Sequence, residues 1–153
     1  TRQFARHVWY LPFLRTWVDR DPPPEEAHPT LGPQAYPKGM GELLKRYHEE
    51  YGDPVIYITE NGCSDVDAVI EPGRVRDEHR IQFLQQYLAE LEKAILAGSD
   101  VRGYFMWSLL DNFEWSEGYS YRMGFVRVDY ETQERTVKDS AYWYRDMIAN
   151  QAA

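Results

Sequence analysis

The spacing of apolar residues along the chain predicts three helices. In the first two, apolar side chains recur at intervals of three and four residues, which places them on one face of a helix. The third follows an Asp-Ser pair, whose side chains are suited to capping a first helical turn. The predicted helices span residues 37–51, 77–97 and 139–150.

Two short apolar runs predict buried parallel strands. Residues 55–58 are Val-Ile-Tyr-Ile, which is apolar on both sides of the alternation and typical of a strand covered on both faces. Residues 103–107, Gly-Tyr-Phe-Met-Trp, form the second run. Because long helices alternate with these strands, the order predicts parallel β-α-β units with right-handed crossovers.

The remaining segments predict loops and one hairpin. Residues 1–36 lack sustained periodicity and contain Pro-Pro-Pro and Gly-Pro, which favours a long irregular loop. Residues 63–76 and the polar, aromatic stretch 108–121 predict two further loops. Alternating apolar positions in residues 124–130 and 135–137, separated by Glu-Thr-Gln-Glu, predict an antiparallel hairpin.

Two parallel strands are too few for a complete α/β domain. A two-stranded parallel sheet leaves both of its edges unpaired, and it cannot close into a barrel. The 153 residues also begin with Thr1 rather than with Met. We therefore expect the chain to be one part of a larger α/β domain.

Composition and charge narrow the classes of partner. Apolar residues make up 43% of the chain and aromatic residues 15%, which suits a packed core and sites for flat, amphipathic ligands. The net charge of -8 disfavours nucleic acid and anionic membrane surfaces, because both are negatively charged. The sequence contains neither an apolar run of the ~20 residues that span a membrane nor a signal-peptide segment.

The single cysteine and the four histidines are interpreted as structural residues. One cysteine, Cys63, excludes an internal disulfide and favours a cytoplasmic location. A structural thiol is favoured over a nucleophile at this position, because no His–Asp pattern surrounds it. The histidines lack metal-ligand spacing, so we expect no metal ion, and His48 is interpreted as a packing or surface residue.

Polar and aromatic side chains follow both predicted strands. Glu60 and Asn61 come after the first strand, and Trp107, Glu114 and Trp115 end or follow the second. Functional groups of parallel α/β folds collect at the carboxyl ends of strands, so neighbouring strands would bring these side chains to one pocket. A sugar suits such a pocket, because its apolar face stacks on indole while its hydroxyls donate to carboxylates.

Simpler structural interpretations of these residues stay open at this point. A glutamate that ends a strand is more often a capping or solvated residue, and a tryptophan there is more often part of the core. Asp111 and Asn112 are interpreted as turn residues. A carboxylate on a rigid strand end can also attack an anomeric carbon, which keeps a catalytic role for Glu60 among the alternatives.

Longer stretches of the sequence resemble the family 1 glycoside hydrolases, of the β-glucosidase and β-galactosidase type. The resemblance rests on YITENG at residues 57–62 and on GYFMWSLLDNFEWSEGYSYRMGFVRVDYETQERTVKDSAYWY at residues 103–144, and it weakens before residue 36. It implies an α/β fold: the C-terminal section of a (β/α)8 TIM barrel, about strands 7 and 8 with flanking helices. Residues 1–153 would then be the C-terminal part of a single domain, with a loop region in 1–36 and βα units and a terminal helix in 37–153.

The same resemblance implies a retaining β-glycosidase that hydrolyses terminal β-D-glucosyl or related residues and needs no cofactor. Glu60 is similar to the family's nucleophile, and Trp107 resembles the residue that forms the sugar platform. The Trp107–Ser108 peptide bond would correspond to a cis bond. Glu114 and Trp115 resemble the pair that binds the outer hydroxyls of a terminal sugar. The charge of Glu114 would repel a 6-phosphate, which disfavours the 6-phospho-β-glycosidases.

The acid/base motif of that family, Thr-x-Asn-Glu-Pro, does not occur in these 153 residues. A retaining glycosidase needs a second carboxyl group ~5 to 5.5 Å from the nucleophile. We therefore expect an upstream segment of the same barrel to be the partner that supplies it, with a β-glucoside or related small sugar as substrate. The alternatives are an isolated, catalytically incompetent fragment, a weak sugar-binding remnant, and a relative altered in its acid residue.

Three positions depart from the family pattern. Met123 stands where the family commonly has Phe, and Tyr87 stands where it often has His. Residues 34–36, Gln-Ala-Tyr, replace a segment that commonly contains Trp and that lies near the leaving-group side of the site. We expect Tyr87 to be structural and the pocket wall at Met123 to be looser, because methionine is flexible.

Overall fold

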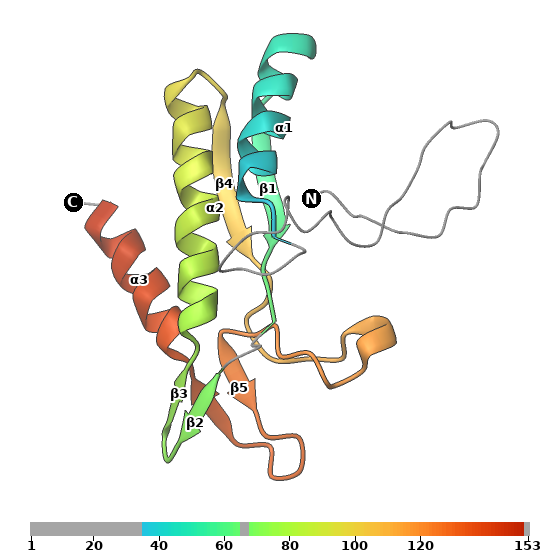
Figure 1. The fold of residues 1–153 in the computed structure, drawn as a ribbon, viewed down its shortest axis with the longest axis vertical. Helices are drawn as coiled ribbons and strands as arrows, with labels where there is room; N and C mark the ends of the chain where they lie inside the picture. Colours follow the sequence, from blue (N-terminus) through green and yellow to red (C-terminus); the bar gives the residue numbers. More distant parts are fainter. Residues whose placement is uncertain (1–34, 65–67, 152–153) are drawn as a thin grey trace, which may run out of the picture. The chain divides into compact units, whose positions relative to one another are not determined.

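The computed structural model describes residues 35–64 and 68–151, and its three helices begin and end within one residue of the predicted bounds (Figure 1). The predicted loop over residues 1–36 lies almost entirely outside the described residues. The helices are α1 (Pro37–Glu50), α2 (Glu78–Leu96) and α3 (Asp139–Gln151). The strands are β1 (Ile56–Asn61), β2 (Val69–Glu71), β3 (Arg74–Arg76), β4 (Val101–Met106), β5 (Val126–Val128) and β6 (Arg135–Val137), and Trp115–Glu117 form a short 3-10 helix.

The chain divides into two compact units, and helix α2 begins in one and ends in the other. The first unit holds α1 and the second half of α2. Its core contains Leu44 and Leu91, and the hydroxyl of Tyr87 accepts a hydrogen bond from the backbone N–H of Tyr36 at 3.1 Å. Tyr87 is therefore a buried structural residue, as predicted. Gly98 has a φ of +111°, a conformation that glycine adopts readily, and α2 ends just before it.

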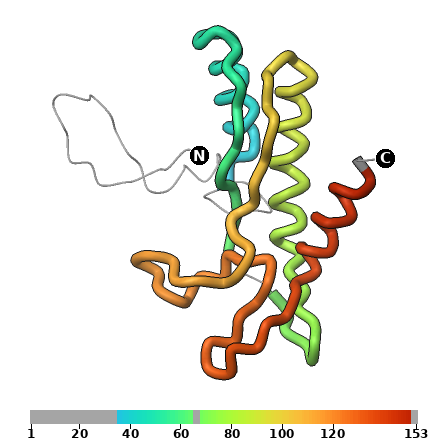
Figure 2. The backbone as a smooth tube through the Cα atoms, turned by 180° about the vertical axis from the view of Figure 1, so that it is seen from behind, coloured from blue at the N-terminus to red at the C-terminus, as the bar shows by residue number. Residues whose placement is uncertain are grey.

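The second unit holds helix α3 and the six strands found in the described ranges. Strands β1 and β4 lie side by side in Figure 1 and in the reverse view of Figure 2, and they pair in parallel, with Ile56 opposite Val101 and Asn61 opposite Met106. This confirms the predicted parallel neighbours. Helix α3 packs through Tyr144, whose ring centroid lies 5.3 Å from that of Phe125.

The prediction that strands 55–58 and 103–107 are buried on both faces is wrong for the described chain. Val55 is 48% exposed, Tyr57 is 55% exposed and Phe105 is 57% exposed. The physical reason is the size of the sheet: within the described ranges, β1 and β4 hydrogen-bond only to each other. Apolar strand faces of this kind are normally covered in α/β proteins. The two-stranded sheet therefore exposes apolar faces and unpaired edges that a larger domain would cover.

Residues 63–76 were predicted to form a loop, but the structure places a hairpin within them. Strands β2 and β3 pair antiparallel, with Ile70 opposite Val75, and Gly73 has a φ of +71° in the turn between them. The Pro-Gly pair forms the turn of this hairpin, and each strand has only three residues. Such short strands fall below the length at which alternation is informative, which explains the missed prediction.

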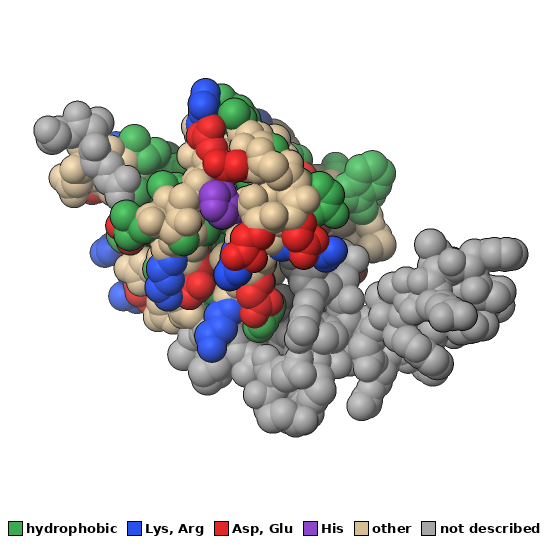
Figure 3. Space-filling view, turned by 90° about the horizontal axis from the view of Figure 1, so that it is seen from above, with side chains coloured by type: hydrophobic (Ala, Val, Ile, Leu, Met, Phe, Trp, Pro, Cys, Tyr) green, Lys and Arg blue, Asp and Glu red, His purple; other side chains and the backbone are tan. Residues whose placement is uncertain are grey.

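Basic and acidic side chains lie beside one another on the face seen in Figure 3. Helix α1 carries two exposed ion pairs spaced four residues apart, Lys45–Glu49 and Arg46–Glu50. Exposed pairs of this kind contribute little to stability, so we interpret them as solvated charges. Within the described ranges, no helix combines the length and the apolar character needed to cross a lipid bilayer.

Candidate functional site

The carboxyl ends of β1 and β4 bring two of the predicted site residues to neighbouring strands. Glu60 and Asn61 end β1, and the backbone N–H of Trp107, just after β4, donates to the carbonyl of Asn61 at 3.0 Å. The side chain of Asn61 accepts a hydrogen bond from the hydroxyl of Tyr104 at 2.7 Å. Glu60 itself is exposed. The strand end therefore holds Asn61 in the sheet and presents the carboxylate beside it to solvent.

At Gly62, just after β1, the backbone lies close to Trp107, just after β4. A Cβ atom built on Gly62 would lie 1.9 Å from the carbonyl oxygen of Trp107. Side chains of any kind are excluded at that distance, because the obstacle is backbone rather than a movable side chain. The glycine that follows Glu60 and Asn61 thus has a physical cause: it lets the end of β1 lie against Trp107, the residue that follows β4.

Trp107 and Glu114 are in contact. The indole Nε1–H of Trp107 donates to Oε2 of Glu114 at 3.4 Å, and Trp107 remains 36% exposed. The indole hydrogen bond orients the carboxylate and leaves part of the ring free for a ligand. Trp115, the other predicted binding residue, begins the short 3-10 helix and is 83% exposed. In the described chain Trp115 therefore has most of its surface available.

The Trp107–Ser108 peptide bond is cis, as the family resemblance implied. Beyond it, the chain runs alongside the segment that leads into β5. The Ser108 carbonyl accepts from the N–H of Phe125 at 2.8 Å, and the Leu109 carbonyl accepts from the N–H of Val126 at 2.9 Å. The loop that carries Glu114 is thus anchored at its start by backbone hydrogen bonds.

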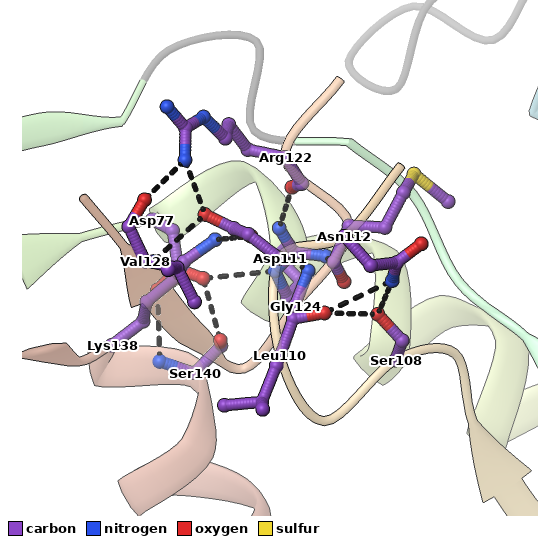
Figure 4. Close-up of polar contacts among 12 residues, drawn as sticks. Asp77, Ser108, Leu110, Asp111, Asn112, Arg122, Gly124, Val128, Lys138 and Ser140 are labelled. Carbon is purple, nitrogen blue, oxygen red and sulfur yellow. Dashed lines mark hydrogen bonds and ion pairs between the residues drawn. The ribbon is translucent and has the colours of Figure 1, made fainter. Parts of the chain in front are cut away.

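The interpretation of Asp111 as a turn residue is wrong, whereas the side chain of Asn112 hydrogen-bonds within the loop. Asp111 is buried and forms ion pairs with Lys138 at 2.9 Å and with Arg122 at 3.3 Å (Figure 4). Asn112 donates from Nδ2 to the hydroxyl of Ser108 and to a nearby carbonyl, both at 3.0 Å. Burial and the nearby Arg80 charge lower the pKa of Lys138 to about 8, while Asp111 opposes this change.

A second buried charge cluster lies at the start of α2. Arg80 forms an ion pair with Asp77 at 2.9 Å, and Asp77 accepts two hydrogen bonds from Ser140, from the backbone N–H at 2.9 Å and from the hydroxyl at 2.5 Å. Burial raises the pKa of Asp77, and the bonds from Ser140 counteract it. Neither cluster could be predicted from the sequence, because each joins residues that are far apart along the chain. Within the described ranges, no group of His, Cys, Asp and Glu is arranged to hold a metal ion.

Cys63 is partly buried, and the desolvation of its thiol raises the pKa to about 11. A thiol with so high a pKa is protonated at neutral pH and is a poor nucleophile. The structural interpretation of Cys63 is therefore favoured by its surroundings. The nearby Arg80 lowers this pKa, but by less than burial raises it.

We expect the reaction of Cys63 with a thiol reagent to be about fiftyfold slower in the folded protein than in denaturant at pH 9, because the folded thiolate fraction is that much smaller. The raised pKa also means that this thiol stabilises the fold below pH ~9 and that its contribution is lost between pH ~9 and ~11. Stopped-flow measurement of thiol modification against pH tests this. Equal rates in the folded and the denatured protein would contradict it.

The arrangement as a whole suits a ligand with an apolar face and several hydroxyl groups. A carboxylate at one strand end lies next to a strand end that carries an indole ring, and that ring is hydrogen-bonded to a second carboxylate. Carboxylates accept hydrogen bonds strongly, and an indole face packs against flat apolar surfaces. These are the groups that a sugar-binding site needs.

Comparison with known proteins places the chain among glycosidases. The family model described as glycosyl hydrolase family 1 matches residues 19–153. β-Glucosidase A of Thermotoga maritima is 49% identical over 135 residues, which cover 88% of this chain and 29% of that protein. A 6-phospho-β-galactosidase of Streptococcus equi subsp. zooepidemicus is 47% identical over 115 residues, which cover 74% of this chain and 24% of that protein.

Solved structures agree with these matches. A Thermotoga maritima family 1 glycoside hydrolase complexed with a cyclophellitol analogue transition state mimic superposes with a TM-score of 0.75 at 49% identity, covering 88% of this chain and 29% of that one. A β-glucosidase from Thermotoga maritima in complex with glucoimidazole has the same TM-score at 48% identity, covering 88% of this chain and 30% of that one. The chain spans less than a third of the length of these relatives.

Proposed function

This chain belongs to glycosyl hydrolase family 1, and from that premise we propose that it supplies the nucleophile and part of the sugar pocket of a retaining β-glycosidase. Family 1 glycosidases are (β/α)8 barrels, and the chain covers part of that fold. In this proposal β1 and β4 are strands 7 and 8 of the barrel. The observation that carries the proposal is the pairing of β1, which ends in Glu60, with β4, which leads into the Trp107–Glu114 contact.

Glu60 is the proposed nucleophile because its carboxylate is exposed at the end of a paired strand. It attacks C1 of the β-glycoside, the bond from C1 to the leaving oxygen breaks, and an acid from the upstream part of the barrel protonates that oxygen. Water then attacks C1 of the glycosyl-enzyme ester, the same upstream residue takes the proton, and Glu60 is released as a carboxylate. Two inversions at C1 restore the β configuration.

The contact between Trp107 and Glu114 supports a binding role for both residues. The indole N–H uses one lone pair of the Glu114 carboxylate, and the remaining lone pairs are free to accept from sugar hydroxyls. The ring of Trp107 offers a face on which the apolar side of a pyranose stacks. Trp115, which is exposed beside Glu114 in the chain, is proposed to bind the same outer hydroxyls.

The substrate is proposed to be a neutral β-glucoside or a related β-glycoside rather than a 6-phosphorylated one. The identity to a 6-phospho-β-galactosidase favours the phosphorylated class as a second candidate. The carboxylate of Glu114 opposes it, because a phosphate beside this carboxylate would be repelled. The two candidate substrates, the neutral and the 6-phosphorylated β-glycoside, therefore differ in the charge that they would place next to Glu114.

The proposal is tested by joining this chain to the upstream part of Thermotoga maritima β-glucosidase A, in place of the 29% of that protein which it matches. We expect the joined protein to hydrolyse 4-nitrophenyl β-D-glucoside, with β-glucose as the first product by NMR. The isolated chain, whose apolar sheet faces are exposed, should aggregate and show no hydrolysis. A cooperatively folded joined protein without activity on the β-glucoside, β-galactoside or β-fucoside would overturn the proposal.

The same preparation separates the two substrate classes. We expect a higher kcat/KM for the neutral β-galactoside than for its 6-phosphate. Replacing Glu114 by Gln should narrow this difference, because it removes the negative charge and keeps the size of the side chain. A preference of the unchanged protein for the 6-phosphate would favour the second candidate.

A further inference from the structure

The sugar-binding loop, defined here as residues 107–115, has one fully buried carboxylate at its centre. Asp111 lies four residues after Trp107 and three before Glu114, and its side chain is 0% exposed. Glu114 itself is only partly buried, and its neighbour Trp115 is exposed. Burial of their own side chains therefore does not fix the positions of Glu114 and Trp115, and other contacts of the loop must do so.

The carboxylate of Asp111 accepts hydrogen bonds from four donors outside the loop (Figure 4). Oδ1 accepts from the backbone N–H of Gly124 and from Nζ of Lys138, both at 2.9 Å. Oδ2 accepts from Nη1 of Arg122 at 3.3 Å and from the backbone N–H of Val128 at 3.4 Å. One side chain thus ties the middle of the loop to β5, to the segment before it and to the residue that precedes α3.

A carboxylate is the side chain that fits this set of donors. It has two oxygens with about four lone-pair sites, whereas an amide of the same shape has one oxygen and a nitrogen that donates. An asparagine at residue 111 would turn an N–H toward donors that are already N–H groups. The backbone of the loop also lies close to the backbone of Gly124. A Cβ on Gly124 would lie 2.2 Å from the backbone nitrogen of Asp111.

The side chain of Arg80 links the segment that binds Asp111 to the chain just beyond the proposed nucleophile. The guanidinium of Arg80 donates to the carbonyls of Arg122 at 2.8 Å and Met123 at 2.9 Å. It also donates to the carbonyl of Cys63, three residues after Glu60. Arg80 therefore connects the chain after β1 to residues 122–124, and Arg122 and Gly124 of that segment bind Asp111 in the sugar-binding loop.

We propose that Asp111 is a positioning residue: its buried carboxylate fixes the sugar-binding loop to residues 122–124 and thereby places Glu114 and Trp107 relative to Glu60. This inference rests on the proposed function, because it assigns Asp111 an effect on the binding of the sugar. Asp111 does not touch the substrate in this proposal. It acts through the loop that carries Trp107 and Glu114.

The test is a double-mutant cycle in the joined protein described above. Asp111→Asn is expected to lower kcat/KM for 4-nitrophenyl β-D-glucoside about tenfold or more, and about threefold or less when Glu114→Gln is already present. Rates are counted per active site, by titration with a 2-deoxy-2-fluoro-β-glucoside, well below the unfolding temperature. A merely structural role for Asp111 would lower the number of active sites and leave no coupling to Glu114.

The cycle has a matched control, Asp129→Asn, and an alternative variant in case Asp111→Asn does not fold. Asp129→Asn removes another carboxylate, one that accepts from two backbone N–H groups in the β5–β6 turn, and should leave kcat/KM unchanged. Asp111→Asn removes the negative charge that lies 2.9 Å from the buried Lys138 ammonium, so Asp111→Asn/Lys138→Met replaces it in the cycle if the single variant does not fold. The second measurement is the 19F NMR signal of fluorinated Trp107, which should shift with Asp111→Asn and not with Asp129→Asn.

The outcomes separate this inference from the proposed function. Activity in the unchanged protein, with additive effects of Asp111→Asn and Glu114→Gln and an unmoved Trp107 signal, overturns the positioning role and leaves the glycosidase proposal standing. A folded but inactive protein whose Trp107 signal moves with Asp111→Asn overturns the glycosidase proposal and supports the positioning of the loop by Asp111.

Discussion

Replacement of Glu60 by glutamine is expected to lower kcat for β-glucoside hydrolysis by at least about a thousandfold. Glutamine has nearly the shape of glutamate, but its amide is neutral and does not attack C1 to form an ester. Because Glu60 is exposed at the end of β1, the substitution leaves no buried group unpaired among residues 35–64 and 68–151. The free energy of unfolding should therefore change by less than about 0.5 kcal/mol. Steady-state kinetics and thermal unfolding of the same preparation measure both effects.

Glu71→Gln is the matched control for this variant. Glu71 lies on β2 and forms an exposed ion pair with Arg76 at 2.8 Å. It is a glutamate at the end of a strand in the same unit, but no site residue contacts it in the described chain. Its replacement should leave kcat and KM unchanged. Near-normal turnover by Glu60→Gln, with Glu71→Gln as the reference, would contradict the nucleophile assignment.

Replacement of Gly62 by alanine is expected to destabilise the protein by about 1 to 3 kcal/mol, as overpacking does in cores. The added Cβ would lie 1.9 Å from the Trp107 carbonyl oxygen, so the ends of β1 and β4 must move apart. That movement separates Glu60 from Trp107, and we expect kcat/KM to fall together with stability. Urea unfolding and kinetics below the transition measure the two losses.

Gly41→Ala is the control, and it is expected to raise the stability of the protein rather than lower it. Gly41 lies within α1, and a Cβ there would meet the end of the flexible Glu90 side chain at 3.1 Å, which can move aside. Alanine in a helix is favoured over glycine by about 0.5 to 1 kcal/mol, so this variant should be slightly more stable and fully active. Equal stability and activity of Gly62→Ala and Gly41→Ala would show that the strand ends are not held as closely as described.

The local elements of this fold could be predicted from the sequence because their signals are local. The apolar stripes, Pro37 at the start of α1 and Gly98 after the end of α2 define the helices within one residue. The parallel pairing of β1 and β4 followed from their alternation with helices. The position of Trp107 and Glu114 near each other followed from the rule that site residues gather at strand ends.

The buried charge clusters could not be predicted, because their partners are far apart in the sequence. Asp77 and Ser140 are 63 residues apart, and Asp111 and Lys138 are 27 apart. Each of these residues, taken alone, is of a type that is typical of surface or turn positions. The signal that could have found Asp111 is its place between two predicted binding residues in a loop that has to be held rigidly.

The exposure of the strands could not be predicted from periodicity either. The apolar pattern of β1 and β4 describes the sheet that these strands are suited to, and the described chain contains only two strands of it. Tyr57 and Phe105 are consequently exposed, although the pattern predicts burial. The difference is informative, because it marks the surface that further strands of a barrel would cover.

The proposed role of Glu60 as the nucleophile is tested by trapping the glycosyl-enzyme with a 2-deoxy-2-fluoro-β-glucoside whose leaving group is activated. The fluorine slows both steps, and the activated leaving group lets the first step proceed, so the covalent sugar accumulates. Intact mass and peptide mapping of the joined protein should show one sugar per molecule, on Glu60. An active protein that carries the label on another residue, or that turns over while Glu60 stays unlabelled, would contradict the account.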